Sequence, residues 1–293
     1  MSKTIKTIKV YRKDLHENDV TEDKGYLQSY TQNNTDGNPV MDITYLPDGE
    51  VEEKYVNNYD EKGNLKENII YYSENEIAER KSYVRDEKGM VVESFIHYQD
   101  DTKDTVKYDY DSDGKLLRRS IINDEDEIEA EDIYEYKNDK VALFIKKEYG
   151  EVVHKEEFEF DESENIASQT VTDGDEDGTI VNFFDEKGNL IKHLRYNEND
   201  KLVGKSVYNF DDKGNMTGIR EETPYEKNSS VLEYDAAGNL ISQIQTGKNG
   251  ENNHTIKRKY DDQNNLLEST VFINMHGQDV DVNYRVLYEY EYF

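Results

Sequence analysis

The chain has 293 residues, a formal net charge of −30 at pH 7, 35% charged residues and only 34% hydrophobic residues. This composition has too little Leu, Ile, Val and Phe for a thick three-layer core, and its negative charge argues against a nucleic-acid partner, because phosphate binding requires basic side chains. The absence of Cys excludes a disulfide framework and a thiolate metal site.

The N-terminal residues 1–14 contain no apolar run long enough for the core of a signal peptide, and no later segment is apolar over the length that spans a bilayer. We therefore predict a soluble, cytoplasmic protein with no membrane partner. Low hydrophobicity with high net charge is also typical of disordered chains. The 24 Tyr and 9 Phe are regularly spaced, however, which favours ordered strands.

A repeat of about 25 residues organises the chain. Each clear copy consists of an aromatic residue, Asp, two variable residues, Gly, Asn and Leu, as in YDEKGNL at 59–65 and FDEKGNL at 184–190. The glycine of the motif stands at Gly63, Gly89, Gly114, Gly188, Gly214 and Gly238. Degenerate copies surround Gly37, Asp139, Glu164 and Asn264.

The chemistry of this motif predicts a hairpin turn. The Asp side chain can accept hydrogen bonds from backbone N–H groups two residues on, and Gly supplies the left-handed conformation that ends a bulged hairpin. The aromatic residue ends one strand and Leu begins the next. We therefore assign the six motif glycines to structural turns.

A second, looser turn lies halfway along most units, near Asn75, Asp126, Asp200, Gly250 and Gly277. Turns thus recur about every 12 to 13 residues, which is the spacing of short strands joined as hairpins. The segments between them alternate with the strand period of two: Tyr288, Tyr290 and Tyr292 fall on one side, and Glu289 and Glu291 on the other. Neither side is purely apolar, so cross-strand ladders of Tyr, Lys and Glu must supply much of the stability, at roughly 0.2 to 1 kcal/mol a pair.

We predict a single all-β domain over 1–293, an antiparallel meander of about 20 short strands in repeated hairpins. A sheet of that many strands cannot lie flat, and we expect a coiled or solenoid-like extended sheet. Residues 1–36 and 265–293 are the expected capping units.

The aromatic-Asp-x-x-Gly-Asn-Leu segments at 59–65, 184–190 and 234–240, and the copy with Met at 210–216, resemble the YD repeat of RHS-type proteins. The resemblance implies a long sheet that winds into a shell, in a family whose members often enclose a toxin domain and act in competition between bacteria or at the cell surface. The units here are longer than the usual YD repeat, and Asn replaces the Arg that follows the turn glycine in that family.

The residue types needed for catalysis are dispersed. No two histidines have the sequence spacing of paired metal ligands. The histidines are His16, His97, His154, His193, His254 and His276. Carboxylates are so abundant that paired acids are no sign of a glycosidase. We therefore expect no enzyme activity.

Two segments, 109–114 and 173–178, read Asp-x-Asp-x-Asp-Gly, which is how a calcium-binding loop begins. The twelfth position, where such a loop places a bidentate Glu, is Ser120 in the first and Phe184 in the second. The alternative is an Asp-rich hairpin turn. The candidate calcium ligands are Asp173, Asp175 and Asp177, and we expect no other cofactor.

Two functions remain open. The first is a non-enzymatic, acidic protein that binds a basic protein, as an immunity protein, antitoxin or chaperone for a secreted toxin. Its candidate binding residues form an acidic patch at Asp124, Glu125, Asp126 and Glu127. The second is a structural or carbohydrate-binding surface module whose exposed Tyr ladders stack on sugars, although the sequence shows no export signal.

Overall fold

The computed structural model describes residues 3–15, 23–172, 178–274 and 281–293, and these form 22 β-strands and no helix. The first eleven are β1 (Ile5–Asp14), β2 (Tyr26–Asn33), β3 (Pro39–Tyr45), β4 (Val51–Tyr59), β5 (Leu65–Tyr71), β6 (Ile77–Arg85), β7 (Val91–His97), β8 (Lys103–Tyr110), β9 (Leu116–Ile122), β10 (Ile128–Lys137) and β11 (Lys140–Glu148). The others are β12 (Glu151–Phe160), β13 (Ile166–Thr172), β14 (Gly178–Phe184), β15 (Leu190–Asn197), β16 (Leu202–Phe210), β17 (Met216–Glu222), β18 (Lys227–Tyr234), β19 (Leu240–Thr246), β20 (Asn252–Tyr260), β21 (Leu266–Ile273) and β22 (Val282–Tyr292).

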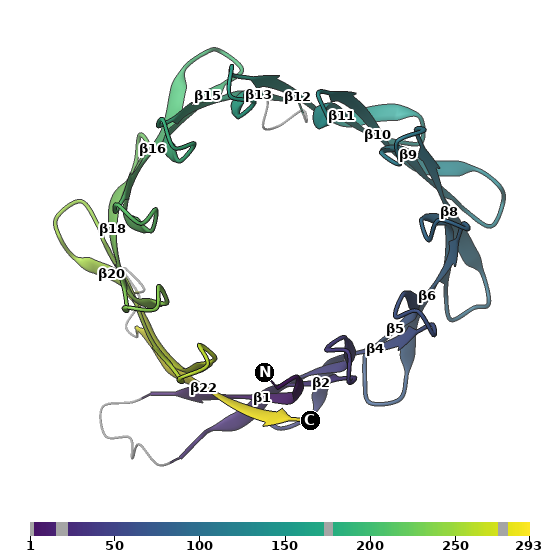
Figure 1. Cartoon of the computed structure of the whole chain (residues 1–293), viewed down its shortest axis with the longest axis horizontal. Coiled ribbons are helices and arrows are strands. Elements are labelled where there is room, and N and C mark those ends of the chain that lie inside the picture. Colours follow the sequence, from purple (N-terminus) through teal and green to yellow (C-terminus); the bar gives the residue numbers. More distant parts are fainter. Residues whose placement is uncertain (1–2, 16–22, 173–177, 275–280) are drawn as a thin grey trace.

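The strands form one antiparallel sheet that closes into a barrel (Figure 1). Each strand pairs with the next along the chain, and β1 pairs with both β2 and β22. The all-β class and the repeated hairpins agree with the prediction, but the coiled or solenoid-like extended sheet is wrong, because the two ends of the sheet meet.

The closing pair, β1 with β22, has a long and regular register. Ile8 lies opposite Tyr290, Lys9 opposite Glu289 and Val10 opposite Tyr288. An open sheet of this length would leave the backbone N–H and C=O groups of two edge strands unpaired, and closure pairs them with each other. The described strands of the two terminal units, β1 with β2 and β21 with β22, therefore lie side by side.

The connections between strands lie at two rims. The motif rim holds the turns that follow even-numbered strands, and its segments are 34–38, 60–64, 86–90, 111–115, 138–139, 161–165, 185–189, 211–215, 235–239 and 261–265. The variable rim holds those that follow odd-numbered strands, and its fully described segments are 46–50, 72–76, 98–102, 123–127, 149–150, 198–201, 223–226 and 247–251. In Figure 1 the motif-rim turns curl towards the ring axis, whereas the variable-rim hairpins splay outward.

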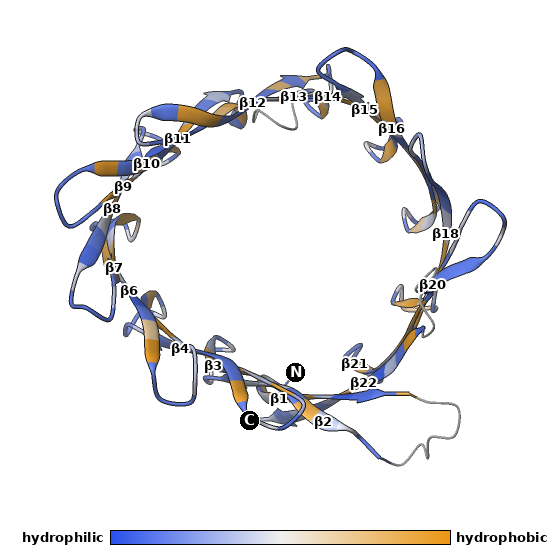
Figure 2. Ribbon diagram, turned by 180° about the vertical axis from the view of Figure 1, so that it is seen from behind, coloured by the Kyte–Doolittle hydropathy of each residue, from blue (hydrophilic) through white to orange (hydrophobic). Residues whose placement is uncertain are grey.

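The barrel wall has little apolar core. Among the described residues the buried hydrophobic side chains are Val106, Val271 and Val286, and small hydroxyl side chains such as Ser94 and Ser230 are buried as well. Hydrophilic and hydrophobic residues intermingle along the strands (Figure 2). Pairing between neighbouring strands must therefore supply much of the stability, as the composition predicted.

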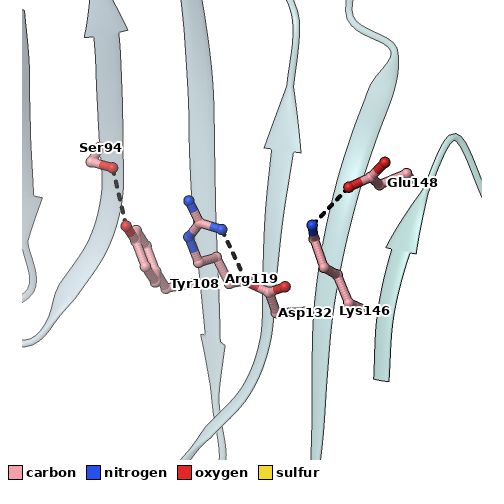
Figure 3. A network of polar contacts seen from close by, with 6 residues as sticks. All are labelled: Ser94, Tyr108, Arg119, Asp132, Lys146 and Glu148. Carbon is pink, nitrogen blue, oxygen red and sulfur yellow. Dashed lines mark hydrogen bonds and ion pairs between the residues drawn. The ribbon is translucent and has the colours of Figure 1, made fainter. Parts of the chain in front are cut away.

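One polar ladder shows how side chains link the strands (Figure 3). Tyr108, Arg119, Asp132 and Lys146 lie opposite one another in register on β8 to β11. Arg119 Nη1 donates to Asp132 Oδ2 over 2.9 Å across the β9–β10 pair, whereas Lys146 Nζ donates over 2.7 Å to Glu148 Oε1, two residues along the same strand β11. Tyr108 OH and Ser94 Oγ are 3.2 Å apart. Half-exposed cross-strand pairs of this kind contribute roughly 0.2 to 1 kcal/mol each.

Candidate functional site

The acid of the repeated motif serves the turn itself. Asp60 Oδ1 accepts hydrogen bonds from Lys62 N over 2.9 Å and from Asn64 N over 2.8 Å, and Asp60 Oδ2 accepts from Asn64 Nδ2 over 3.0 Å. These bonds from Asn64 lower the pKa of Asp60. The same arrangement, with a lowered Asp pKa, recurs at Asp161, Asp185, Asp211, Asp235 and Asp261. These carboxylates are engaged within the turn.

The motif glycines hold the left-handed conformation that the sequence requires of them. Their φ angles are +80° at Gly63, +88° at Gly89, +85° at Gly114, +82° at Gly188, +86° at Gly214 and +91° at Gly238. Three of the degenerate copies reach the same region without glycine, with φ of 66° at Asp139, 61° at Glu164 and 66° at Asn264. Asp and Asn tolerate this conformation better than other non-glycine residues.

The aromatic residue of the motif has a role that the sequence analysis missed. Tyr110 OH, at the end of β8, donates to the carbonyl of Val91, the first residue of β7, over 2.8 Å. The β7–β8 ladder has ended at Glu93 and Lys107, so this carbonyl lies beyond the last strand pair. Equivalent bonds, which we call tyrosine clasps, join Tyr59 to Pro39, Tyr136 to Leu116, Tyr234 to Met216, Tyr260 to Leu240 and Tyr290 to Leu266.

Other residues partly replace the clasp where Tyr is absent. Arg85 Nη2 donates to Leu65 O over 3.3 Å, and Asn182 Nδ2 donates to Ile166 O over 3.1 Å. At the ends of β12, β14 and β16 the motif has Phe, which has no hydroxyl to donate. The choice between Tyr and Phe was therefore the sequence signal that distinguishes clasped from unclasped copies.

Tyrosines of the variable rim are exposed instead. Tyr72 is 52%, Tyr98 40%, Tyr149 74% and Tyr225 94% exposed, and all four belong to connections of this rim. Tyr and other aromatic side chains are enriched where proteins bind one another, because they bury a large area with little loss of conformational freedom. The variable rim is therefore the better candidate for a binding surface.

The predicted acidic patch lies on this rim, in the connection between β9 and β10. Asn123 Oδ1 accepts from the backbone N–H groups of Glu125 and Glu127 over 3.0 and 2.9 Å, which holds the turn. Asp124, Glu125, Asp126 and Glu127 are exposed, and within the described part of the chain their carboxylates form no hydrogen bond or ion pair.

Apolar and aromatic side chains flank these acids. The backbone N–H of Tyr149 donates to Glu129 O over 2.8 Å, which places Tyr149 beside the acidic connection. Ile128 and Val152 are exposed at the adjoining strand ends. We call residues 124–128 together with Tyr149 the acidic tip. It combines four carboxylates without internal partners, an exposed aromatic ring and an apolar side chain.

The excess negative charge of the chain lies in its connections. Basic and acidic side chains nearly balance over the 22 strands, with a slight basic excess, so the connecting segments account for the whole of the net charge of −30. Within the strands many charges meet an opposite partner, as Arg119 meets Asp132. Charge available to a binding partner is therefore concentrated at the rims.

The candidate calcium ligands Asp173, Asp175 and Asp177 lie outside the described residues. In the other Asp-rich segment, Asp111 Oδ1 accepts from the backbone N–H groups of Asp113 and Lys115, each over 2.9 Å, as in the other motif turns. No cluster of three or more His, Cys, Asp or Glu side chains suited to a metal ion occurs in the described ranges.

The described histidines lie apart from one another. His154 contacts Glu156 over 2.8 Å, and His193 contacts Asn182 over 3.0 Å. His97 Nε2 lies 3.2 Å from Ser82 Oγ, but no described carboxylate bonds to the other ring nitrogen of His97, as nucleophilic catalysis by a Ser–His pair would require. His16 and His276 lie outside the described residues. The expectation that the protein is not an enzyme stays a prediction.

No helix in the described ranges is both long and apolar enough to cross a membrane. No protein-family model matches the chain, and no curated protein matches it.

Two solved structures align with the chain at low similarity. One is TcdB2-TccC3 without its hypervariable C-terminal region, with 10% identity, a TM-score of 0.29 and alignment over 84% of this chain and 20% of that one. The chain thus spans about a fifth of the length of that protein. The other is a porin-like protein from Bacteroides uniformis ATCC 8492, with 8% identity, a TM-score of 0.34 and 98% coverage of both chains. The chain has a β-rich repeat fold, and similarities this low transfer no functional property to it.

Proposed function

We propose that the chain is a non-enzymatic protein-binding β-repeat protein whose variable rim binds a basic protein. The observation that carries this proposal is the acidic tip, where four consecutive carboxylates have no partner within the described chain and stand beside Tyr149 and Ile128. Carboxylates can pair with Arg and Lys, and an aromatic ring can hold the same cations by cation–π attraction. An apolar and aromatic anchor inside a charged border is the usual anatomy of a protein interface.

The distribution of charge supports the same partner. Because the strands are nearly neutral, the field of a chain with a net charge of −30 originates at the rims. Such a field attracts basic proteins from a distance and raises their association rate, and salt weakens it. We expect the complex to form quickly and to be sensitive to ionic strength.

We further propose that the protein is a cytoplasmic immunity protein, antitoxin or chaperone for a toxin. This role rests on the resemblance of the motif to the YD repeat. It is an analogy with that family and is not based on the geometry of the site. The alternative, sugar stacking on Tyr ladders, has less support because ladder residues such as Tyr83, Tyr108 and Tyr288 are only partly exposed.

The test is an affinity purification from the native host at low salt, followed by binding measurements with the purified partner. In one variant Asp124, Glu125, Asp126 and Glu127 are replaced by Asn or Gln. The matched control neutralises four exposed motif-rim acids, Glu61, Glu87, Glu186 and Asp212, so that both variants have the same net charge.

We expect a basic partner, and at least about tenfold weaker binding for the tip variant than for the control, equivalent to about 1.4 kcal/mol. The proposal fails if no specific partner is captured at low salt, or if both variants weaken binding equally. The second result would indicate general charge attraction without a site.

A further inference from the structure

A second feature of the variable rim is an open groove between the connections 223–226 and 247–251, on a different arc of the barrel from the acidic tip. Its volume is about 520 Å³. The polar and aromatic side chains that could contact a ligand there are those of Tyr225, Asn228, Gln245, Asn253, His254 and Asn274. Most of them are carboxamides, which distinguishes this groove from the acidic surface around it.

The strand register and local hydrogen bonds hold these side chains in place. Gln245 on β19 lies opposite His254 on β20, and both belong to one cross-strand row that also contains Ser230 and Ile273. Asn253 Nδ2 donates to Asn228 Oδ1 over 3.0 Å, and the backbone N–H of Asn274 donates to Asn253 O over 2.8 Å. The groove wall is thus part of the sheet.

Several polar groups of this wall have no partner within the described chain. The Asn228 Nδ2 group, the Gln245 carboxamide and the His254 imidazole form no hydrogen bond there. A carboxamide both donates and accepts, and a neutral imidazole does the same with its two nitrogens. This combination matches a ligand hydroxyl, which also donates and accepts.

Tyr225 forms an aromatic wall at the mouth of the groove. It is 94% exposed, yet its turn is held by Thr223 Oγ1, which accepts from the N–H groups of Tyr225 and Glu226 over 3.3 and 3.0 Å. Pro224 further restricts the backbone of this turn. Because the turn backbone is already held, a ligand that stacks on Tyr225 has to order only the side chain.

The charges around the groove balance. Lys227 forms an ion pair with Glu222, and Glu251 Oε2 accepts from the backbone N–H of Asn249 over 2.8 Å. The residues that line the groove include two acids, Glu226 and Glu251, and two bases, Lys227 and Lys248. In a chain with a net charge of −30, a neutral groove is suited to an uncharged ligand.

We propose that this groove binds a neutral saccharide of one or two rings, with Tyr225 stacking on a sugar face and the carboxamides bonding to its hydroxyls. The groove volume lies within the range typical of small-molecule sites. The proposal is independent of the basic protein partner, because it concerns other residues and an uncharged ligand.

The test uses the full chain and a panel of neutral disaccharides, namely maltose, cellobiose, lactose and N,N′-diacetylchitobiose, in saturation-transfer NMR and calorimetry. We expect at least one of them to bind with an affinity that does not change between low and high salt, unlike the protein complex. Tyr225→Ala should weaken binding at least about tenfold because the stacking surface is lost. Gln245→Leu should weaken it as well, whereas Tyr149→Ala, which removes another exposed tyrosine of the same rim, should leave it unchanged.

The proposal is overturned if no sugar of the panel binds, if Tyr225→Ala and Gln245→Leu both bind as well as the wild type, or if Tyr149→Ala weakens binding as much as Tyr225→Ala. Circular dichroism of each variant establishes that it is folded. If the chain binds its protein partner but no disaccharide, the groove proposal fails and the proposed function is unaffected. If it binds a disaccharide but no protein partner, the proposed function fails and the groove proposal is unaffected.

Discussion

The two rims of the barrel use the same residue types for different purposes. On the motif rim, Asp carboxylates such as Asp60 bind the backbone of their own turn, and tyrosines such as Tyr110 clasp a neighbouring strand. On the variable rim, Asp124 forms no bond within the described chain and Tyr149 is 74% exposed. The recurring Asp and Tyr of the motif are therefore structural, whereas the acids at 124–127 and Tyr149 are available for binding. Asp48 and Asp100 of the variable rim still hold their own turns.

This difference shows that abundance of a residue type is a poor guide to function in a repeat protein. The acids that recur most regularly are those whose hydrogen bonds are already satisfied. Irregular acids, which the turn does not need, remain available to a partner. Four substitutions test this division, beginning with the largest expected effect on stability.

Gly188→Val should lower the free energy of unfolding by about 1 to 3 kcal/mol, because a β-branched residue resists positive φ. An added Cβ would meet no atom within 4 Å, so the cost comes from the backbone conformation and not from crowding. Chemical denaturation measures the change. Gly188→Asn is the control and should cost much less, since Asn264 holds the same position with a φ of 66°. Equal losses would contradict this account of the turn.

Tyr110→Phe should lower the free energy of unfolding by about 0.5 to 1.5 kcal/mol, because it removes the hydroxyl that bonds to the Val91 carbonyl. Tyr149→Phe makes the same chemical change on the variable rim, where the hydroxyl has no partner in the described chain, and should have almost no effect. Thermal or urea unfolding of both variants measures the difference. Similar values for the two would remove the structural distinction between the rims.

Phe210→Tyr should strengthen an unclasped copy. Phe210 ends β16, and by analogy with Tyr234 and Met216 the new hydroxyl would reach the carbonyl of Leu190, the first residue of β15. We expect a gain of up to about 1 kcal/mol in the free energy of unfolding, the typical net value of one hydrogen bond. A loss of stability would show that the Phe copies have a different rim geometry.

Asn239→Met should alter the acid sensitivity of one turn. Hydrogen bonds from Asn239 lower the pKa of Asp235 from its ordinary value of 3.8. Their contribution is thus present above that value and is lost as the pH falls through the lowered pKa. The variant, which copies the Met90 of another unit, also loses the bond from Asn239 Nδ2 to Asn264 Oδ1 over 2.9 Å, so it should be less stable at every pH, with a larger loss near neutral pH than at the acid end. Unfolding measured across this pH range tests it, and a difference independent of pH would exclude the proposed linkage.

The local structure of the hairpins follows from the sequence alone. Asp and Gly at fixed spacing specify a turn through hydrogen bonds that span only five residues, as between Asp60 and Asn64, so the hairpins and the alternation of Tyr288 with Glu289 could be predicted. The acidic segment 124–127 was also visible as a charge run. The exposure of Tyr149 and Tyr225 was not predicted, although neither is followed by the Asp-x-x-Gly segment that follows the clasped Tyr110.

The closure of the sheet and the grouping of side chains at each rim depend on the tertiary structure. Closure depends on the pairing of β1 with β22, strands at opposite ends of the chain, and on the accumulated twist and curvature of all the strands between them. No local pattern records that sum, and an open coil and a closed barrel can use identical hairpins. Pairing between successive hairpins, which an open sheet would share, places Tyr149 beside the acidic connection and lets carboxamides from β18, β19 and β20 line one groove.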